Sequence, residues 1–222
     1  MEKLQRRVFD PDNAWWAFLG RGVDLVGLSL AWAFLCIPVV TFGPATSALY
    51  YTVVKCFRQR EKSTFTIFFS ALRGNLKQGI LATLICLPVT VLLVFGYSVM
   101  KANWSTSFGT VMFVAYDIAL VVPLGIMVWL VPLLGRFDAP LKEVFRTAAM
   151  LTFRHLPTTV VAVLLTLEAG IFLLEQWWPV FFMPALWALL LSLFFERIFP
   201  KYLSEPEIEK LNETTETPVR EE

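Results

Sequence analysis

The chain has 222 residues, of which 57% are hydrophobic and 15% aromatic, and its mean hydropathy is +0.63. Its apolar residues are clustered in blocks that a water-soluble core of this size cannot absorb, which favours a membrane protein. The net charge of +1 gives no support for nucleic-acid binding through a basic surface. Cys36, Cys56 and Cys86 lie in apolar runs without CxxC spacing, so neither a disulfide framework nor a zinc site is indicated.

The two ends of the chain differ from its middle. Residues 1–22 open with basic residues but lack the compact apolar stretch of a secretory leader, and we interpret them as a cytoplasmic N-terminus with an interfacial segment, DPDNAWWAFLGR. Residues 23–200 form a single predicted transmembrane domain. Residues 201–222 are polar and acidic, so we expect a mobile cytoplasmic tail.

Apolar runs predict the membrane spans, because about 20 helical residues cross the hydrocarbon core. Five runs qualify: 23–40, 78–97, 108–134, 157–174 and 177–195. A sixth candidate, 44–60, is shorter. With six passes and cytoplasmic termini, all of the 19 Lys and Arg residues except Lys101 fall on the inner side. We therefore predict an all-helical protein with six transmembrane helices in three hairpins, located in the plasma membrane.

The first predicted hairpin turns within the stretch CIPVVTFGPATSALYY, residues 36–51. Pro38 and the pair Gly43-Pro44 end one helix and begin the next, and the small side chains that follow allow close helix packing. A second interpretation is that the short helix 44–60 begins below the outer surface, where its first amides and the Thr46 or Ser47 hydroxyl face an anionic or polyol ligand.

Two amphipathic segments precede the other two hairpins, at 63–77 and after Pro140. Their apolar residues recur at helical spacing, which predicts elbow helices in the inner membrane interface with their apolar faces toward the lipid. The candidate interface residues of these elbows are Phe65, Phe68, Phe69, Leu72, Asn75, Leu141, Phe145, Arg146 and Arg154.

Three acidic residues fall within predicted spans. Asp24, one turn after Arg21, is most simply part of an interfacial ion pair. Glu168 lies well inside the run 157–174, where an ionised carboxylate is costly. It is a candidate proton, cation or substrate site, or a hydrogen-bonded acid that fixes helix packing. Asp117 could join it, or lie at the interface if its span begins near Ala115. His155 is the single histidine, and we interpret it as an interfacial residue.

The hairpin stretch resembles the signature of the YesL family of bacterial membrane proteins. The resemblance rests on Ile37-Pro38-Val39-Val40-Thr41, Gly43-Pro44-Ala45-Thr46 and Ala48-Leu49-Tyr50, with Phe68, Phe69, Ala71 and Asn75 in the first elbow, and it extends over most of 12–200. Ser29 stands where the family would have Asn. The signature residues to follow in the structure are Pro38, Thr41, Gly43, Pro44, Ala45, Thr46 and Tyr50.

The resemblance implies a context and no mechanism. The family has no established biochemical activity; its members typically occur in Gram-positive bacteria, encoded among genes for carbohydrate uptake transporters, sensor kinases and polysaccharide-degrading enzymes. We expect an accessory or assembly partner of an ABC-type carbohydrate uptake system, bound to a permease or sensor kinase. The alternative is a small transporter that uses Glu168, with or without Asp117. No nucleotide-binding or hydrolase motif occurs, so we expect no enzyme, cofactor or metal.

Overall fold

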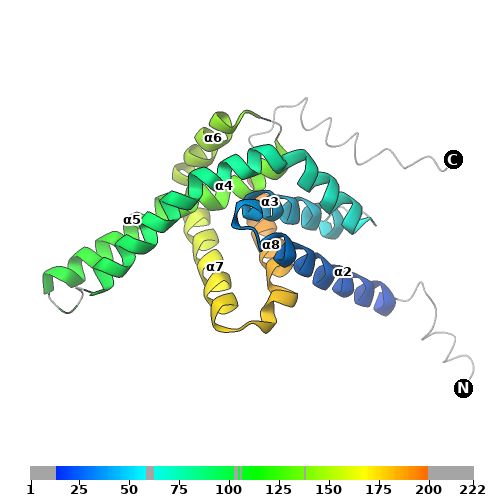
Figure 1. The fold of residues 1–222 in the computed structure, drawn as a ribbon, viewed down its shortest axis with the longest axis horizontal. Coiled ribbons are helices and arrows are strands. Elements are labelled where there is room, and N and C mark those ends of the chain that lie inside the picture. The colour runs from blue at the N-terminus through cyan, green and yellow to red at the C-terminus, as the bar shows by residue number, and fades with distance from the viewer. Residues whose placement is uncertain (1–13, 59–62, 103–104, 106, 138, 200–222) are drawn as a thin grey trace, which may run out of the picture.

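The computed structural model describes residues 14–58, 63–102, 105, 107–137 and 139–199. These residues form helices and no strand (Figure 1), which confirms the prediction of an all-helical fold. The α-helices are α2 (Ala14–Leu35), α3 (Phe42–Val53), α4 (Thr64–Ala102), α5 (Ser107–Arg136), α6 (Leu141–Arg154), α7 (Leu156–Glu175) and α8 (Met183–Phe195). Short 3₁₀ turns, η1 (Val39–Thr41) and η3 (Trp178–Phe181), and a π-helical turn, η2 (Val54–Arg58), complete them.

Within the described residues, three helices are long and apolar enough to cross a membrane: Thr64–Ala102, Phe108–Arg136 and Leu156–Glu175. The predicted spans 108–134 and 157–174 coincide with α5 and α7 within two residues. Met183–Phe195 is a shorter apolar helix, which extends about 20 Å at ~1.5 Å per residue. Together with η2, α3 covers most of the predicted segment 44–60.

The first elbow is not a separate helix. Residues 64–102 form one continuous α4. No helix-breaking residue stands at the expected boundary between 77 and 78, and Gly79 is tolerated inside a helix. The expected orientation of its apolar face toward lipid is also incorrect in part. Phe68 and Leu72 are buried inside the protein, whereas Phe65 and Phe69 are 43% and 45% exposed.

The second elbow is a separate amphipathic helix, as its spacing predicts. On α6, Val144, Ala148 and Leu151 are buried, while Arg146 and Arg154 are exposed. His155 leaves helical geometry at φ −122° and ψ 47°, and α7 then begins with Pro in its first turn. A proline at this position has no helical hydrogen bond to lose.

Three other boundaries differ from the prediction. Residues 14–22 are continuous with the rest of α2, so the described part of the N-terminal segment is not a separate elbow. α2 ends at Leu35, before Pro38, and α8 begins only at Met183. Pro184 explains the late start, because a helix from residue 177 would place it in the interior, where a proline removes a hydrogen bond and clashes with the preceding turn. In α8 it lies in the first turn, where it is tolerated. The predictions for 1–13 and for the tail 201–222 lie outside the described residues.

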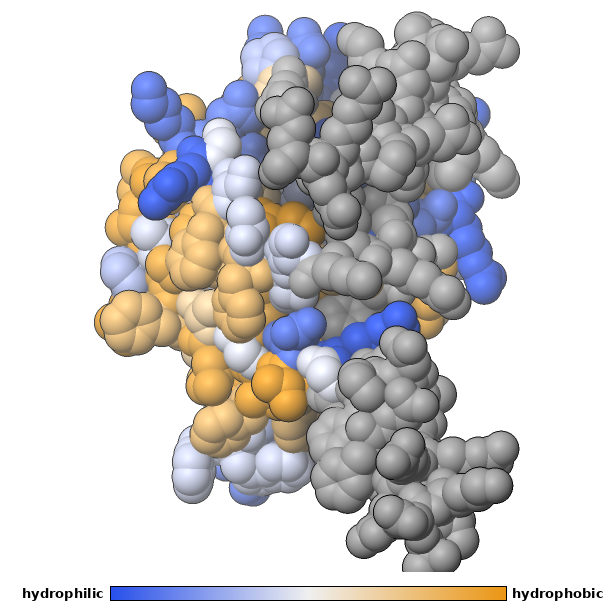
Figure 2. Space-filling model, turned by 90° about the vertical axis from the view of Figure 1, so that its right-hand side faces the viewer, coloured by the Kyte–Doolittle hydropathy of each residue, from blue (hydrophilic) through white to orange (hydrophobic). Residues whose placement is uncertain are grey.

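Helix α3 lies at the centre of the fold and contacts α2, α4, α5 and α8 (Figure 1). We call α3, with the residues of these helices that pack on it, the hub. Residues 88–102 of α4 and 107–122 of α5 run side by side beyond the other helices, and we call them the arm. Figure 2 shows hydrophobic side chains over the middle of one face of the molecule, with hydrophilic ones gathered above them.

Candidate functional site

The predicted hairpin corner is a site of very close helix packing. A Cβ atom on Gly79 of α4 would lie 2.7 Å from the Cα atom of Pro44, and one on Gly43 would lie 2.6 Å from the carbonyl oxygen of Gly79. The Gly43 N–H donates to the Thr83 hydroxyl at 3.0 Å, and this hydroxyl donates to the Gly79 carbonyl at 2.8 Å. Glycine is therefore required at the crossing of α3 and α4, as in close helix contacts generally.

Threonine hydroxyls complete the corner. The Thr41 hydroxyl is within hydrogen-bonding distance of the carbonyls of Pro38, at 2.7 Å, and Leu35, which closes the turn after α2. The Thr46 hydroxyl accepts the indole N–H of Trp32 at 3.1 Å and donates to the Phe42 carbonyl at 2.6 Å. Both signature threonines thus bind backbone carbonyls, and Thr46 also binds Trp32.

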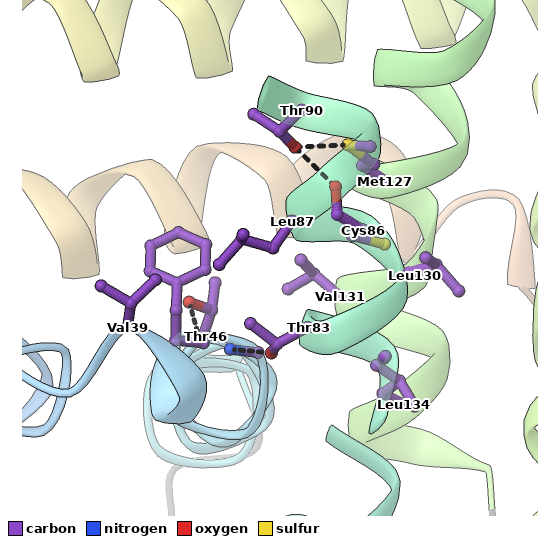
Figure 3. A pocket seen from close by; sticks show the side chains of 13 residues that line it. Val39, Thr46, Thr83, Cys86, Leu87, Thr90, Met127, Leu130, Val131 and Leu134 are labelled. Atoms are coloured by element: carbon purple, nitrogen blue, oxygen red, sulfur yellow. Dashed lines mark hydrogen bonds between the residues drawn. The ribbon is translucent and has the colours of Figure 1, made fainter. Parts of the chain in front are cut away.

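A cavity of about 280 Å³ lies against this corner, between α3, α4 and α5 (Figure 3). Its lining is mainly apolar and includes Leu87, Leu130 and Val131. The hydroxyl of Thr90, at its far end, donates to the Cys86 carbonyl at 2.9 Å. Because the lining hydroxyls already bind backbone groups, the cavity suits an apolar group better than the anionic or polyol ligand considered from the sequence.

Tyr50, the last signature residue, belongs to a polar cluster at the other end of α3. Its hydroxyl lies 3.3 Å from Oε1 of Glu196, and the same oxygen forms an ion pair with Arg136. The two side chains of the pair are only 14% and 12% exposed, and the Arg136 guanidinium lies over the Phe199 ring at 5.5 Å. The cluster joins α3 to the ends of α5 and α8.

Sequence reasoning missed this ion pair, since its partners are 60 residues apart. A signal was present, because Arg136 and Glu196 each follow a long apolar run. Ionisable residues in or beside membrane helices usually pair with one another, so each of these two charges predicts a partner.

Three tryptophans bind threonines across helix contacts. Besides Trp32 and Thr46, Trp129 of α5 donates to Thr159 of α7 at 3.0 Å, and Trp187 of α8 donates to Thr166 of α7 at 3.1 Å. Ser29 has a comparable role: its buried hydroxyl accepts the N–H of Ala185 in the first turn of α8 at 3.3 Å. Ser29 therefore satisfies one of the N–H groups that a helix N-terminus leaves without a partner.

The first elbow contributes to a polar cavity of about 380 Å³. Asn75 and Ser70 of α4 line it with Tyr51, Lys55 and Arg136. The Lys55 ammonium also lies 5.2 Å from the Tyr51 ring centroid. Of the candidate elbow residues, Asn75 therefore lines this cavity and is half-buried.

Asp117 and Glu168 do not both line one cavity. Asp117 is exposed and lines a groove of about 510 Å³ between the arm and α7. Glu168 is also exposed, and it is not one of the groove-lining residues. Among the described residues, no group of three or more His, Cys, Asp or Glu side chains could hold a metal ion.

Residues 25–97 match the model of a family described as a protein of unknown function, DUF624. The matched region contains the second half of α2, all of α3 and most of α4, and so includes the whole corner around Gly43 and Gly79. No curated protein and no solved structure matches the chain. The similarity thus covers the region in which α2, α3 and α4 pack together, and it assigns no activity, because the function of this family is unknown.

Proposed function

We propose that this chain is a multi-pass protein of a bacterial plasma membrane, with both termini cytoplasmic, and that it serves as an accessory or assembly partner of an ABC-type carbohydrate uptake system. The support comes from the resemblance of its hairpin to the YesL signature and from the three long apolar helices. On this proposal the protein has no catalytic activity of its own.

One observation carries the choice of an assembly role. In the described part of the chain, every buried side-chain nitrogen or oxygen atom has a hydrogen-bond partner within the protein. A path for a sugar needs polar groups that exchange a partner in the protein for one in the substrate. Because the buried polar groups are already hydrogen-bonded within the protein, we propose that the function depends on the protein's exposed surface and not on an internal path.

The proposed contact surface is the outward face of α6. Arg146 and Arg154 are exposed there, beside Met150 and Phe153, which are 48% and 60% exposed. A surface with cations around apolar side chains fits a cytoplasmic protein region with acidic residues at the membrane boundary.

The test is purification of the tagged protein from its native host in mild detergent, with identification of stoichiometric partners. A transporter permease or sensor kinase at near one-to-one ratio is the expected result. The variant Arg146→Glu/Arg154→Glu should lose this partner, whereas Lys101→Glu, at the exposed end of α4, should retain it. Recovery of the protein alone, or with itself only, would contradict the proposal.

The alternative, a small transporter, is favoured by one observation: Asp117 lines the largest groove described above. In that case Glu168→Gln or Asp117→Asn should abolish solute uptake into proteoliposomes without reducing the amount of folded protein. Unchanged uptake by both variants would exclude the alternative.

A further inference from the structure

Glu168 lies on the outward side of α7. The helix buries Thr159, Ala162, Val163 and Ala169, and Glu168 is exposed on another side. Residues three and four apart are surface neighbours on a helix, so Glu168 adjoins Leu164 and Ile171. These two residues line the groove between α7 and the arm, which places Glu168 at the edge of that groove.

The groove therefore has a carboxylate on each side. Asp117 of α5 belongs to its lining, and Glu168 flanks it on α7. Most of the other lining residues are apolar, including Leu120, Val121 and Leu167. At ~1.5 Å per residue, Glu168 is about 18 Å from the start of α7 and about 10 Å from its end. Acids at such depth in a membrane span normally have a partner.

The chain itself supplies no cation at this depth. No Lys or Arg occurs in the stretches 22–54, 78–100, 102–135 and 156–196. A second copy would bring further carboxylates to the groove, and these repel the first pair. A sugar would meet few polar groups there besides Thr90, Tyr97 and Asp117.

We propose that this groove binds a transmembrane helix of another protein, and that this helix carries a Lys or Arg facing Glu168 and Asp117. The inference rests on the proposed assembly function and names the chemistry of the partner. The apolar lining contacts the partner's aliphatic side chains, and the two carboxylates neutralise its cation. Such a pair fixes both the partner and its depth in the membrane.

Site-specific photo-cross-linking in native-host membranes tests the proposal. A photoreactive amino acid at Leu167, inside the groove, should cross-link to a partner segment that is a transmembrane helix with a Lys or Arg. Glu168→Lys should lower the yield at least about tenfold, because it places like charges together. Exchanging the partner's basic residue for Glu should restore the yield in the Glu168→Lys background.

Two controls address folding and position. Glu168→Gln keeps a polar side chain of the same shape and should lower the yield less than Glu168→Lys does. Glu175→Gln, at the end of α7, should leave the yield unchanged. The size-exclusion profile of every variant is compared with that of the parent protein.

Other outcomes overturn the proposal. These are cross-links to a second copy, to lipid only, or to a helix without Lys or Arg, and a yield that Glu168→Lys does not change. If purification still recovers a permease or kinase while Leu167 gives no such cross-link, the assembly function stands and the groove proposal fails.

Discussion

The hub and the arm are both apolar, but they use their side chains differently. In the hub, Ala45, Ser47, Ala48 and Thr52 are fully buried, and glycines allow the helix backbones to touch. In the arm no large hydrophobic side chain is buried; Leu92, for example, is 68% exposed. Close packing in this chain therefore follows small residues and hydroxyls, as expected where lipid is as apolar as leucine.

The two regions also differ in how they satisfy polar groups. The hub pairs its hydroxyls, indoles and one ion pair inside the chain. The arm carries Asp117 at an open groove. The hub therefore determines the fold, while the arm and the neighbouring face of α7 are available to lipid or a partner. The following variants test this division.

Among the polar and glycine variants, the largest effect is expected from the ion pair that closes the hub. Arg136→Met leaves the carboxylate of Glu196 buried with only Tyr50 as a partner, and should lower the free energy of unfolding by about 3 kcal/mol. The double variant Arg136→Met/Glu196→Leu should recover most of this loss, because no buried charge remains. The measurement is denaturant unfolding in detergent micelles. A double variant no more stable than the single one would contradict the account.

The next effect concerns the corner. Gly79→Ala places a methyl group 2.7 Å from the Pro44 Cα atom, so two helix backbones must separate, at a cost of about 1–3 kcal/mol. Gly170→Ala on α7 is the matched control, because its Cβ would meet no atom within 4 Å. It should be neutral or stabilising, since alanine favours helices over glycine. Equal behaviour of the two variants in thermal unfolding would be inconsistent with a close crossing.

A smaller effect is expected for a single buried hydrogen bond. Thr159→Val removes the acceptor of the Trp129 indole N–H, and both residues are almost fully buried. A buried donor left without a partner costs about 1–3 kcal/mol, and here we expect the lower half of that range. Thr158→Val, on the neighbouring half-buried residue, should change stability by less than about 0.5 kcal/mol. Tryptophan fluorescence during denaturant unfolding measures the free energy of unfolding of both variants.

The smallest effect is expected in the arm. A Cβ atom on Gly96 would lie 2.9 Å from Cζ of Tyr116, but this contact involves the end of a half-buried side chain, which can move away if it gives up its hydrogen bond to the Leu93 carbonyl. Gly96→Ala should therefore cost less than about 1 kcal/mol. A loss as large as that of Gly79→Ala would show that the arm is packed as tightly as the hub.

Long apolar runs and punctuating residues made much of the fold predictable. The bounds of α5 and α7 lie within two residues of the ends of two long apolar runs. The corner is predicted by Pro38 and Gly43-Pro44. The helical period of α6 predicted which residues share its apolar face, although this face packs inside the protein and not on lipid as expected. These features are local in sequence, so one chain suffices to find them.

The remaining features depend on tertiary contacts. The continuity of α4 was missed because an amphipathic stretch and an apolar stretch were treated as separate helices, although no breaking residue lies at 77–78. The apolar run 177–195 predicts a helix that starts at 177, whereas Pro184 delays the start of α8 to Met183. Arg136 and Glu196 meet only when α5 and α8 pack together, and local periodicity contains no information about that pairing.

The most direct test of the division between hub and arm is a matched pair of leucine truncations. Leu49 in α3 is 0% exposed and Leu92 in the arm is 68% exposed. Leu49→Ala should lower the free energy of unfolding in detergent by about 2–5 kcal/mol, whereas Leu92→Ala should change it by less than about 0.5 kcal/mol. Losses of similar size at the two positions would contradict the account.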